Sequence, residues 1–373
     1  MRLPSGDLLD SRVTRLRQLL AASGLEALIV TSLPNLAYLT GFFGSAGLAL
    51  VTADTIRLIS DSRYDAVVRR RQREWPVVVP IIVPSSLSYE EALIGALGDF
   101  AGRRVGFEES HLTVRRHRTL TAAPTLAPPR AELVPTDGLV EGLRAVKDAW
   151  EVGILRDAAA RLSTVAKRIL PTALVGLTER EVAGTLEAGL RQVGFERPAF
   201  DTIVAAGANS ALPHHRAGDE RIERGDLVVI DVGGVLDGYA VDLTRTIVVG
   251  AANGRQRKVL DAVAAAQDAA MAAVAPGVAP EAVDQAARRI LAAGDYGEAF
   301  THGTGHGLGL EIHERPRVGP PGDGSPEPLL SEAMVFTIEP GAYFPGWGGV
   351  RIEDDVVVTA SGGERLTDVP VWL

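Results

Sequence analysis

Two acidic residues flank a turn signal in segment 226–250. Asp231 interrupts an apolar run, and Asp242 follows the dipeptide Asp237-Gly238, which is typical of a tight turn. The midpoint between the two acids falls beside that dipeptide, so an antiparallel hairpin would bring their carboxylates close to opposite each other. An unpaired carboxylate is costly to bury among apolar strand residues, and a bound cation relieves that cost. The segment therefore indicates a cation site.

Segment 334–358 repeats this arrangement with glutamates. Glu339 ends an apolar run, Glu353 lies on the returning side, and Gly346 stands at their midpoint inside a Pro-Gly-Trp turn. Between the two segments lie three histidines, His302, His306 and His313. Four carboxylates and an imidazole suit a pair of divalent ions. Each residue alone is more simply a solvated edge residue or a packed histidine, but the mirror-image arrangement of all of them favours a metal site.

The composition limits the classes to which the protein can belong. A length of 373 residues allows one large domain or two ordinary ones, and the net charge of -9 argues against a nucleic-acid-binding surface. The absence of cysteine excludes disulfides, thiolate zinc sites and a cysteine nucleophile. The N-terminus lacks the apolar run of a secretory signal, and no apolar run reaches the length of a membrane span. We expect a cytoplasmic protein without a membrane or nucleic-acid partner.

The first 138 residues alternate helical and strand patterns, which predicts an α/β domain. A proline-punctuated connection at 124–129 and a second break at 134–138 place the domain boundary at 138. The predicted helices cover 11–22, 89–100 and 112–122. The predicted strands cover 26–31, 47–52, 56–60, 77–83 and 104–108.

Residues 139–373 show an order of elements that recurs. A long helix over 143–170 and a helix over 178–194, opened by a capping box, precede the first hairpin. Helices over 254–274 and 280–293 precede the histidine segment and the second hairpin. Two helices and a carboxylate hairpin, occurring twice, predict a duplicated α+β domain. Its hairpins should meet at a pseudo-twofold axis, with the metals where they converge.

These stretches resemble the pita-bread metallopeptidases, and within them the aminopeptidase P and prolidase group. All five metal-ligand positions of that family are occupied, in family order and spacing. The first domain resembles the creatinase-type N-terminal domain through GFFGSAGLALVT (41–52) and ISDSRY (59–64). The matching stretches of the second domain are SALPH (210–214), LVVIDVG (227–233), GYAVDLTRT (238–246), HGTGHGLG (302–309), IEPG (338–341) and GGVRIED (348–354).

The resemblance implies a centre of two divalent ions. Asp231 would hold one metal, Asp242 and Glu353 would bridge both, and His306 and Glu339 would complete the second. A hydroxide held between the ions would attack the scissile carbonyl, and Glu339 would relay its proton to the departing nitrogen. The oxygen-rich donor set favours manganese, with cobalt or zinc as alternatives.

Further roles follow from the same resemblance. His214 and His313 would steady the developing oxyanion and the leaving prolyl nitrogen. Arg351, on the strand face of Glu353, would orient carboxylates, and His302 would line the pocket. His215, the neighbour of His214, is interpreted as solvent-facing or structural.

The substrates expected from the resemblance are short proline-containing peptides. The N-terminal motif favours aminopeptidase P, which releases the first residue of Xaa-Pro peptides. The alternative is prolidase, for which Arg317 would bind the free carboxylate of a dipeptide. The intact ligand set disfavours creatinase and a non-catalytic binding protein of the same fold, and methionine aminopeptidase usually lacks such an N-terminal domain. The family also leads us to expect a homodimer.

Overall fold

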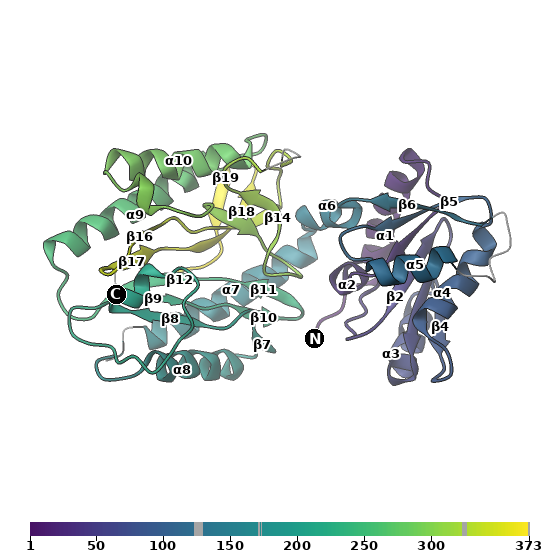
Figure 1. Ribbon diagram of the computed structural model, residues 1–373, viewed down its shortest axis with the longest axis horizontal. Coiled ribbons are helices and arrows are strands. Elements are labelled where there is room, and N and C mark those ends of the chain that lie inside the picture. The colour runs from purple at the N-terminus through teal and green to yellow at the C-terminus, as the bar shows by residue number, and fades with distance from the viewer. Residues whose placement is uncertain (123–129, 171, 173, 323–326, 372–373) are drawn as a thin grey trace. The chain divides into compact units, whose positions relative to one another are not determined.

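The computed structural model describes residues 1–122, 130–170, 172, 174–322 and 327–371 (Figure 1). The chain divides into two compact units, Arg2–Arg144 and Ala145–Leu373, with Met1 assigned to the second. The proline-punctuated connection at 124–129 lies outside the described residues. No helix in the described ranges combines the length and the apolar character needed to cross a membrane.

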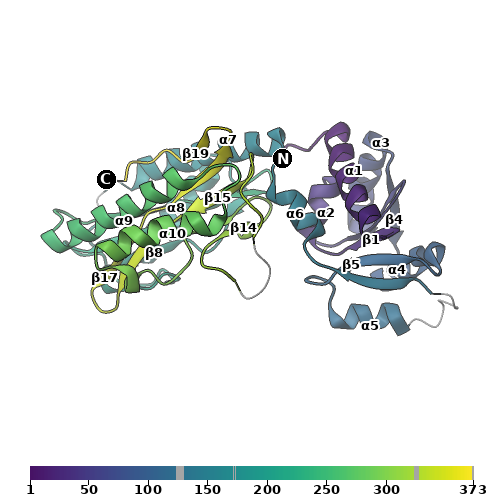
Figure 2. The same ribbon diagram turned by 90° about the horizontal axis from the view of Figure 1, so that it is seen from above.

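The first unit is built on one six-stranded sheet in the order β4-β3-β2-β1-β5-β6. Strand β2 pairs antiparallel with β1 and β3, whereas β1, β5 and β6 run parallel. Figure 2 shows α1 and α3 on the side of the sheet away from α5, so helices cover both faces and the predicted α/β domain is confirmed. The strands are β1 (Ala27–Val30), β2 (Leu48–Thr52), β3 (Ile56–Asp61), β4 (Val78–Val83), β5 (Arg104–Glu108) and β6 (Glu132–Thr136). The main helices are α1 (Gly6–Ala22), α2 (Leu33–Thr40), α3 (Asp65–Glu74), α4 (Tyr89–Leu97), α5 (Val114–Ala122) and α6 (Leu139–Ala145).

Helix α6 belongs with the first unit, so the division falls later in the chain than the predicted position 138. The Asn35 side-chain amide donates to Glu141 Oε1 at 2.6 Å, and Arg144 donates to Asn35 Oδ1 at 2.7 Å. Asn35 also donates to the buried Glu108 at the end of β5. This polar cluster ties α6 to the parallel edge of the sheet.

The second unit contains the predicted repeat. Its first half has α7 and α8 followed by the sheet β12-β9-β8, and its second half has α9 and α10 followed by the sheet β14-β13-β15-β18-β19. Two apolar cores lie between helices and strands, one formed mainly by the first half and one mainly by the second, and each also includes residues of the other half. The helices are α7 (Ala149–Ile169), α8 (Glu179–Gln192), α9 (Gly254–Ala273) and α10 (Pro280–Ala293). The strands are β7 (Arg197–Pro198), β8 (Ile203–Ala206), β9 (Leu227–Asp231), β10 (Gly234–Leu236), β11 (Tyr239–Val241), β12 (Thr244–Val248), β13 (Gly305–Gly307), β14 (Glu314–Val318), β15 (Val335–Ile338), β16 (Gly341–Phe344), β17 (Gly348–Arg351), β18 (Asp354–Thr359) and β19 (Gly362–Arg365).

The prediction of one continuous helix over 143–170 is wrong. The chain leaves helical geometry after Ala145, because Val146 bridges Met334 and the Lys147 N–H donates to the Ala333 carbonyl. A new helix then begins after Asp148, whose carboxylate accepts from the Glu151 N–H at 2.9 Å while Glu151 caps Asp148 in return. Apolar periodicity continues across the break, and the capping box marks it.

Candidate metal centre

The first hairpin places its two acids on one face, two residues out of direct opposition. Asp231 pairs with Thr244, and the last pair before the turn is Leu236 with Tyr239. Asp237 and the following glycine have φ of 50° and 84°, which is the geometry of a two-residue turn of this kind. The turn therefore sets the register, and Asp242 lies diagonally from Asp231 because alternate residues share a face.

The second hairpin opposes its two acids as the sequence predicts. Strand β16 pairs with β17 from Gly341 with Arg351 to Phe344 with Gly348. Continuing that register brings Glu339 opposite Glu353, and Gly346, with a φ of 78°, lies in the turn between the strands.

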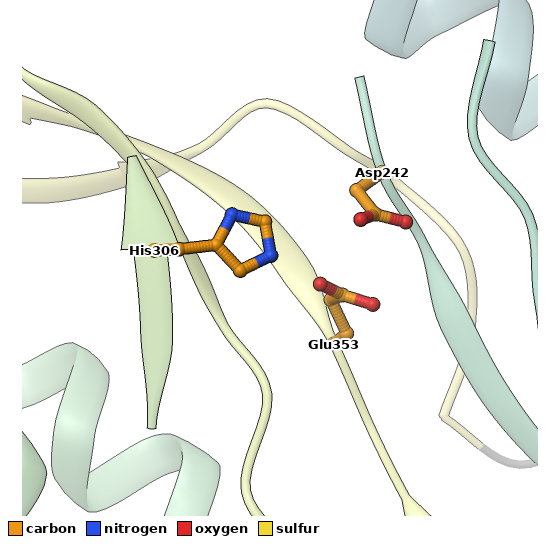
Figure 3. Close-up of side chains that lie close together, drawn as sticks. All are labelled: Asp242, His306 and Glu353. Atoms are coloured by element: carbon orange, nitrogen blue, oxygen red, sulfur yellow. The ribbon is translucent and has the colours of Figure 1, made fainter. Parts of the chain in front are cut away.

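The hairpins and the histidine segment converge on one point. Ligand atoms of Asp242, His306 and Glu353 all lie within 4.8 Å of one another, and Figure 3 shows the imidazole facing the two carboxylates. Glu339 Oε1 lies 3.4 Å from His306 Nε2. Asp231 Oδ1 is buried without a hydrogen-bond partner among the described residues. Four of the five predicted ligands thus contact or approach one another, and the fifth offers an orphaned oxygen.

The electrostatics of this cluster suit a cation. Burial raises the pKa of Asp242 and of Glu353 well above the usual range, and neighbouring carboxylates raise both further. Burial likewise raises the pKa of Glu339 to about 8. Burial lowers the pKa of His306 to about 4, and the nearby His313 adds to that effect. Crowded carboxylates beside a neutral imidazole form the oxygen-rich donor set that divalent ions prefer, so these residues fit metal ions.

Three residues that the sequence did not single out hold these groups in place. Thr244 donates to Glu353 Oε2 at 2.6 Å. Thr337 accepts from the His306 N–H at 3.1 Å and donates to Glu339 at 3.3 Å. Asp355, fully buried, accepts from the Asp242 N–H at 3.0 Å. Each lies two residues from a predicted ligand, so the two side chains share one face of the strand. This spacing could have identified these residues from the sequence.

Arg351 links the centre to two aromatic side chains. Its guanidinium donates to Asp231 at 2.6 Å, to Thr244 at 3.2 Å and to the Tyr343 hydroxyl at 2.9 Å. Tyr343 in turn hydrogen bonds His302 Nε2 at 2.9 Å, and His302 Nδ1 lies 2.7 Å from the Gly303 carbonyl oxygen. Both ring nitrogens of His302 are therefore engaged within the protein.

Two exposed histidines lie near the centre. The His313 ring packs edge-on against His306 with 4.3 Å between centroids. Burial lowers the pKa of His313, and the neighbouring His214 lowers it further, so both face a common region. His215 behaves as a structural residue, because its Nε2 lies 2.7 Å from a carboxylate oxygen of the buried Glu179.

Arg317 stands directly opposite His306 in the ladder between β13 and β14. Its neighbour Val318 is buried in the core against α9 and α10, so alternation turns Arg317 to the face that carries His306. Arg317 is exposed and lines a cavity of about 360 Å³ together with Pro280, Pro320 and Leu329.

Comparison with known proteins agrees with this geometry. Residues 153–360 match Metallopeptidase family M24, and residues 12–146 match the Creatinase/Prolidase N-terminal domain. The Xaa-Pro dipeptidase of Pyrococcus horikoshii is 35% identical over 366 residues, which cover 97% of this chain and 98% of that protein.

Solved structures give the same result. An Xaa-Pro dipeptidase from Bacillus anthracis superposes with a TM-score of 0.89 at 34% identity, covering 98% of this chain and 100% of that one. An X-Pro aminopeptidase from Thermotoga maritima superposes with a TM-score of 0.85 at 32% identity, covering 97% and 98%. The resemblance and the two-part fold predicted from the sequence are thereby confirmed, and the chain belongs to metallopeptidase family M24, with a creatinase-type domain preceding the pita-bread catalytic domain.

Proposed function

We propose that this protein is a metal-dependent Xaa-Pro dipeptidase that holds two divalent ions between its hairpins. The observation that carries the proposal is the convergence of Asp242, His306 and Glu353 in a chain of a metallopeptidase family. Relatives that align over nearly the whole chain are named Xaa-Pro dipeptidases. Dipeptides that end in proline are therefore the proposed substrates.

Dipeptidase replaces aminopeptidase P, the activity that the sequence favoured, as the preferred activity. That preference rested on the N-terminal motif, whose residues contact one another inside the first unit. Phe42 packs edge-on against Tyr64 at 5.2 Å, and the Tyr64 hydroxyl accepts from the Ser45 N–H at 2.9 Å. A Cβ at Gly44 would lie 2.2 Å from the Phe42 ring, so the glycine is needed for this packing. These contacts give the motif a role in the folding of the domain, so its presence alone does not favour one activity over the other.

Arg317 supplies the recognition that a dipeptidase needs. A dipeptide substrate has a free carboxylate on its proline, and a guanidinium binds a carboxylate through two parallel hydrogen bonds. Arg317 stands opposite His306 on the same face and is exposed. We place the proline carboxylate there, which fixes the scissile bond at the side of the hairpins.

The proposed ligands are Asp231, Asp242, His306, Glu339 and Glu353, with manganese as the expected ion. Bound divalent ions would lower the pKa of a coordinated water and polarise the scissile carbonyl. The chain's own part is to hold the ligands in register through Thr244, Thr337, Asp355 and Arg351.

The remaining steps fall to the side chains around the substrate. Glu339 takes the proton released as water adds to the carbonyl carbon, and it returns that proton to the prolyl nitrogen when the C–N bond breaks. His214 and His313 face the region beside His306 and donate hydrogen bonds to the oxyanion and the leaving nitrogen. His302 acts through Tyr343 on Arg351, and so holds Asp231.

Aminopeptidase P is the second candidate, because an X-Pro aminopeptidase structure superposes over 97% of the chain. A paired assay with added Mn²⁺ separates the two activities. The enzyme is given a dipeptide Xaa-Pro and a tripeptide Xaa-Pro-Yaa at equal concentrations. Faster cleavage of the dipeptide supports the proposal, and faster cleavage of the tripeptide reassigns the enzyme to aminopeptidase P.

Arg317→Met and Arg317→Lys sharpen the assay. If Arg317 binds the proline carboxylate, the methionine variant raises KM for the dipeptide and the lysine variant restores part of the affinity. An equal change for both peptides would contradict that role. The proposed homodimer is tested separately, by light scattering of the full chain.

A further inference from the structure

Glu179 is a buried carboxylate whose four hydrogen bonds all go to the segment that carries His214. It is the first residue of α8, and its side chain is fully buried. Oε1 accepts from the Ala206 N–H at 2.9 Å and from the Asn209 amide at 3.0 Å. Oε2 bonds His215 Nε2 at 2.7 Å and accepts from the Gly218 N–H at 3.0 Å.

This pattern differs from ordinary helix capping. A carboxylate at a helix start is favourable beside the positive end of the helix dipole, and it normally bonds the first N–H groups of its own helix. In α8 the capping residue is Thr178, whose hydroxyl accepts a hydrogen bond from the Glu181 N–H. Glu179 instead spans the loop from 206 to 218. Burial acts to raise its pKa, yet the hydrogen bonds outweigh burial and hold the pKa below the usual range.

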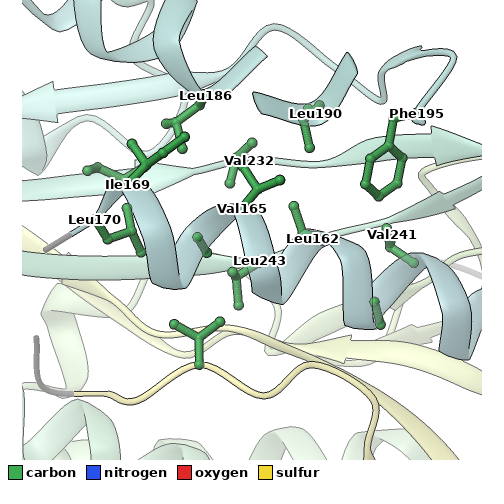
Figure 4. Close-up of a cluster of buried hydrophobic side chains, with 14 of the residues drawn as sticks. Leu162, Val165, Ile169, Leu170, Leu186, Leu190, Phe195, Val232, Val241 and Leu243 are labelled. Carbon is green, nitrogen blue, oxygen red and sulfur yellow. The ribbon is translucent and has the colours of Figure 1, made fainter. Parts of the chain in front are cut away.

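The helix that carries Glu179 is a firm support. Leu186 and Leu190 of α8 pack against Leu162 and Val165 of α7 in the core of the first half (Figure 4). Two backbone hydrogen bonds lie at the same point: the Glu179 N–H donates to the Glu220 carbonyl oxygen, and the Arg180 N–H donates to the Gly218 carbonyl oxygen. A loop bound to Glu179 is therefore bound to the core.

A second anchor holds the opposite side of the same loop. The Gly349 N–H donates to Ser210 Oγ at 2.8 Å, and Arg351 donates to the Pro213 carbonyl oxygen at 3.3 Å. His214 thus lies between Pro213, bound to the hairpin that carries the metal ligands, and His215, bound to Glu179. Its neighbours on both sides are fixed, while its own side chain is exposed.

We propose that Glu179, acting through His215 and the loop backbone, is a positioning residue that fixes His214 against the metal centre. The proposal rests on the proposed function for the role of His214 in catalysis. A displacement of about 1 Å at a group that contacts the reacting atoms can cost on the order of a hundredfold in rate. Loss of the Glu179 anchor should therefore lower kcat while leaving the metal ligands intact.

The first arm of the test is a double-mutant cycle on the metal-loaded enzyme. Glu179→Gln should lower kcat by about tenfold or more with little change in KM, and it should cause no further loss in a His214→Ala background. His215→Gln, which keeps an N–H donor, should retain more activity than His215→Leu. Glu181→Gln, which removes a capping carboxylate from the same helix, is the matched control and should leave kcat near wild type. Independent, additive losses from Glu179→Gln and His214→Ala would overturn the proposal.

The second arm needs no activity. The chain has seven histidines, and ring-labelled histidine gives assignable NMR signals by single substitution. Glu179→Gln should move the His214 and His215 signals and leave those of His302 and His306 in place. An unmoved His214 signal in the folded variant would contradict the proposal, even if kcat falls. Failure of the wild-type enzyme to cleave Xaa-Pro dipeptides would instead overturn the proposed function, and the NMR arm would still decide the positioning.

Discussion

In the first half of the catalytic unit the strands lie in the order β12-β9-β8, and in the second half β18, β15 and β13 follow the same order. The tips also correspond, with β10 and β11 matching β16 and β17. Leu236 and Phe344 are the last paired residues before the two turns. Asp231 lies five residues before Leu236 (231 to 236), and Glu339 lies five residues before Phe344 (339 to 344). The outgoing strands therefore place one acid each at equivalent positions.

The returning strands differ at the equivalent positions. After the turn, the returning strands start at Tyr239 and Gly348. Asp242 and Arg351 each lie three residues after that start (239 to 242 and 348 to 351) and so occupy equivalent positions. Thr244 and Glu353 each lie five residues after it and form a second equivalent pair. Thr244 donates to Glu353, and Arg351 donates to Thr244 and Asp231. A strict repeat would crowd like charges, which costs free energy in a buried site. The departure from symmetry places a hydroxyl and a guanidinium where they hold the acids of the other half.

The imidazole is the second departure. His306 on β13 lies beside Thr337 of β15, whereas the corresponding position on β8 is Ala205, opposite Val229 of β9. Ala205 is fully buried in a small apolar cluster with Val229. Of the proposed ligands, the first half therefore contributes only carboxylates, and the second half contributes the imidazole. The centre belongs to both halves, but they contribute different chemistry.

The largest expected effect comes from removing the charge of one of the two proposed bridging carboxylates, Asp242 in the first half or Glu353 in the second. Asp242→Asn and Glu353→Gln should each lower kcat by about a thousandfold or more, because metal ions supply several kcal/mol of transition-state stabilisation. Kinetics with saturating Mn²⁺ measure this. Asp219→Asn, on the exposed surface beside Arg180, is the control and should have no effect. Retained activity in either variant would show that the halves do not share one centre.

The hydroxyl of Thr244, in the first half, should help Glu353, in the second half, to bind metal. Thr244→Val removes the hydrogen bonds to Glu353 and Arg351 and should weaken Mn²⁺ binding by about tenfold or more. Thr244→Ser keeps the hydroxyl and should bind nearly as tightly as wild type. Calorimetric titration compares the two variants. Equal affinities would mean that the contact across the halves does not support the ligands.

The crowding of acids predicts how the metal-free protein responds to pH. Burial raises the pKa of Glu339 from an ordinary 4.5 to about 8, so between these values the folded chain keeps a proton that the unfolded chain releases. Raising the pH through this window therefore favours unfolding, by up to about 1.4 kcal/mol per pH unit for one group. Asp242 and Glu353 act in the same direction.

Burial lowers the pKa of His306 from an ordinary 6.5 to about 4, which acts in the opposite direction below about pH 6.5. Thermal unfolding in EDTA should accordingly give a melting temperature that falls from about pH 6.5 to 8. Saturating Mn²⁺ should remove most of that fall, because a bound cation takes the place of the protons. Glu339→Gln should reduce the slope. A metal-free protein whose stability rises over this range would contradict the crowded-carboxylate account.

The smallest expected effect concerns the helix starts of the two halves. Helix α8 is capped by Thr178, whereas α10 follows Ala279, which makes no side-chain cap within the described residues. Thr178→Ala should destabilise the protein by about 1 kcal/mol, and Ala279→Ser should stabilise it by up to a similar amount. Thermal unfolding measures both. Shifts of the same sign would show that capping is not what distinguishes the two helices.

Local signals in the sequence predicted the two hairpins that carry the proposed ligands. The register of the second hairpin follows from symmetry about Gly346. In the first hairpin the midpoint of the acids gave a register two residues off, because the Asp237-Gly238 turn sets the pairing at Leu236 and Tyr239. The sequence contains the capping box of Asp148 and Glu151, but the apolar pattern of a helix continues across it, so the sequence did not predict the break.

Contacts between residues that are far apart in the sequence could not be predicted from the sequence. Glu179 bonds residues from 206 to 218, and Lys147 forms a buried ion pair with Glu314 at 2.9 Å, adjacent to His313. No spacing rule relates these residues, because tertiary packing alone brings them together. The hydrogen bonds between Glu179 and the loop that carries His214 are thus a property of the fold rather than of any motif.

The most direct test of the shared centre is a calorimetric titration of the metal-free chain with Mn²⁺, repeated for Asp242→Asn and Glu353→Gln. We expect two ions per wild-type chain and loss of saturable binding at both positions when either proposed bridging carboxylate is removed. Binding of two ions that survives in both variants would contradict a centre built jointly from the two hairpins.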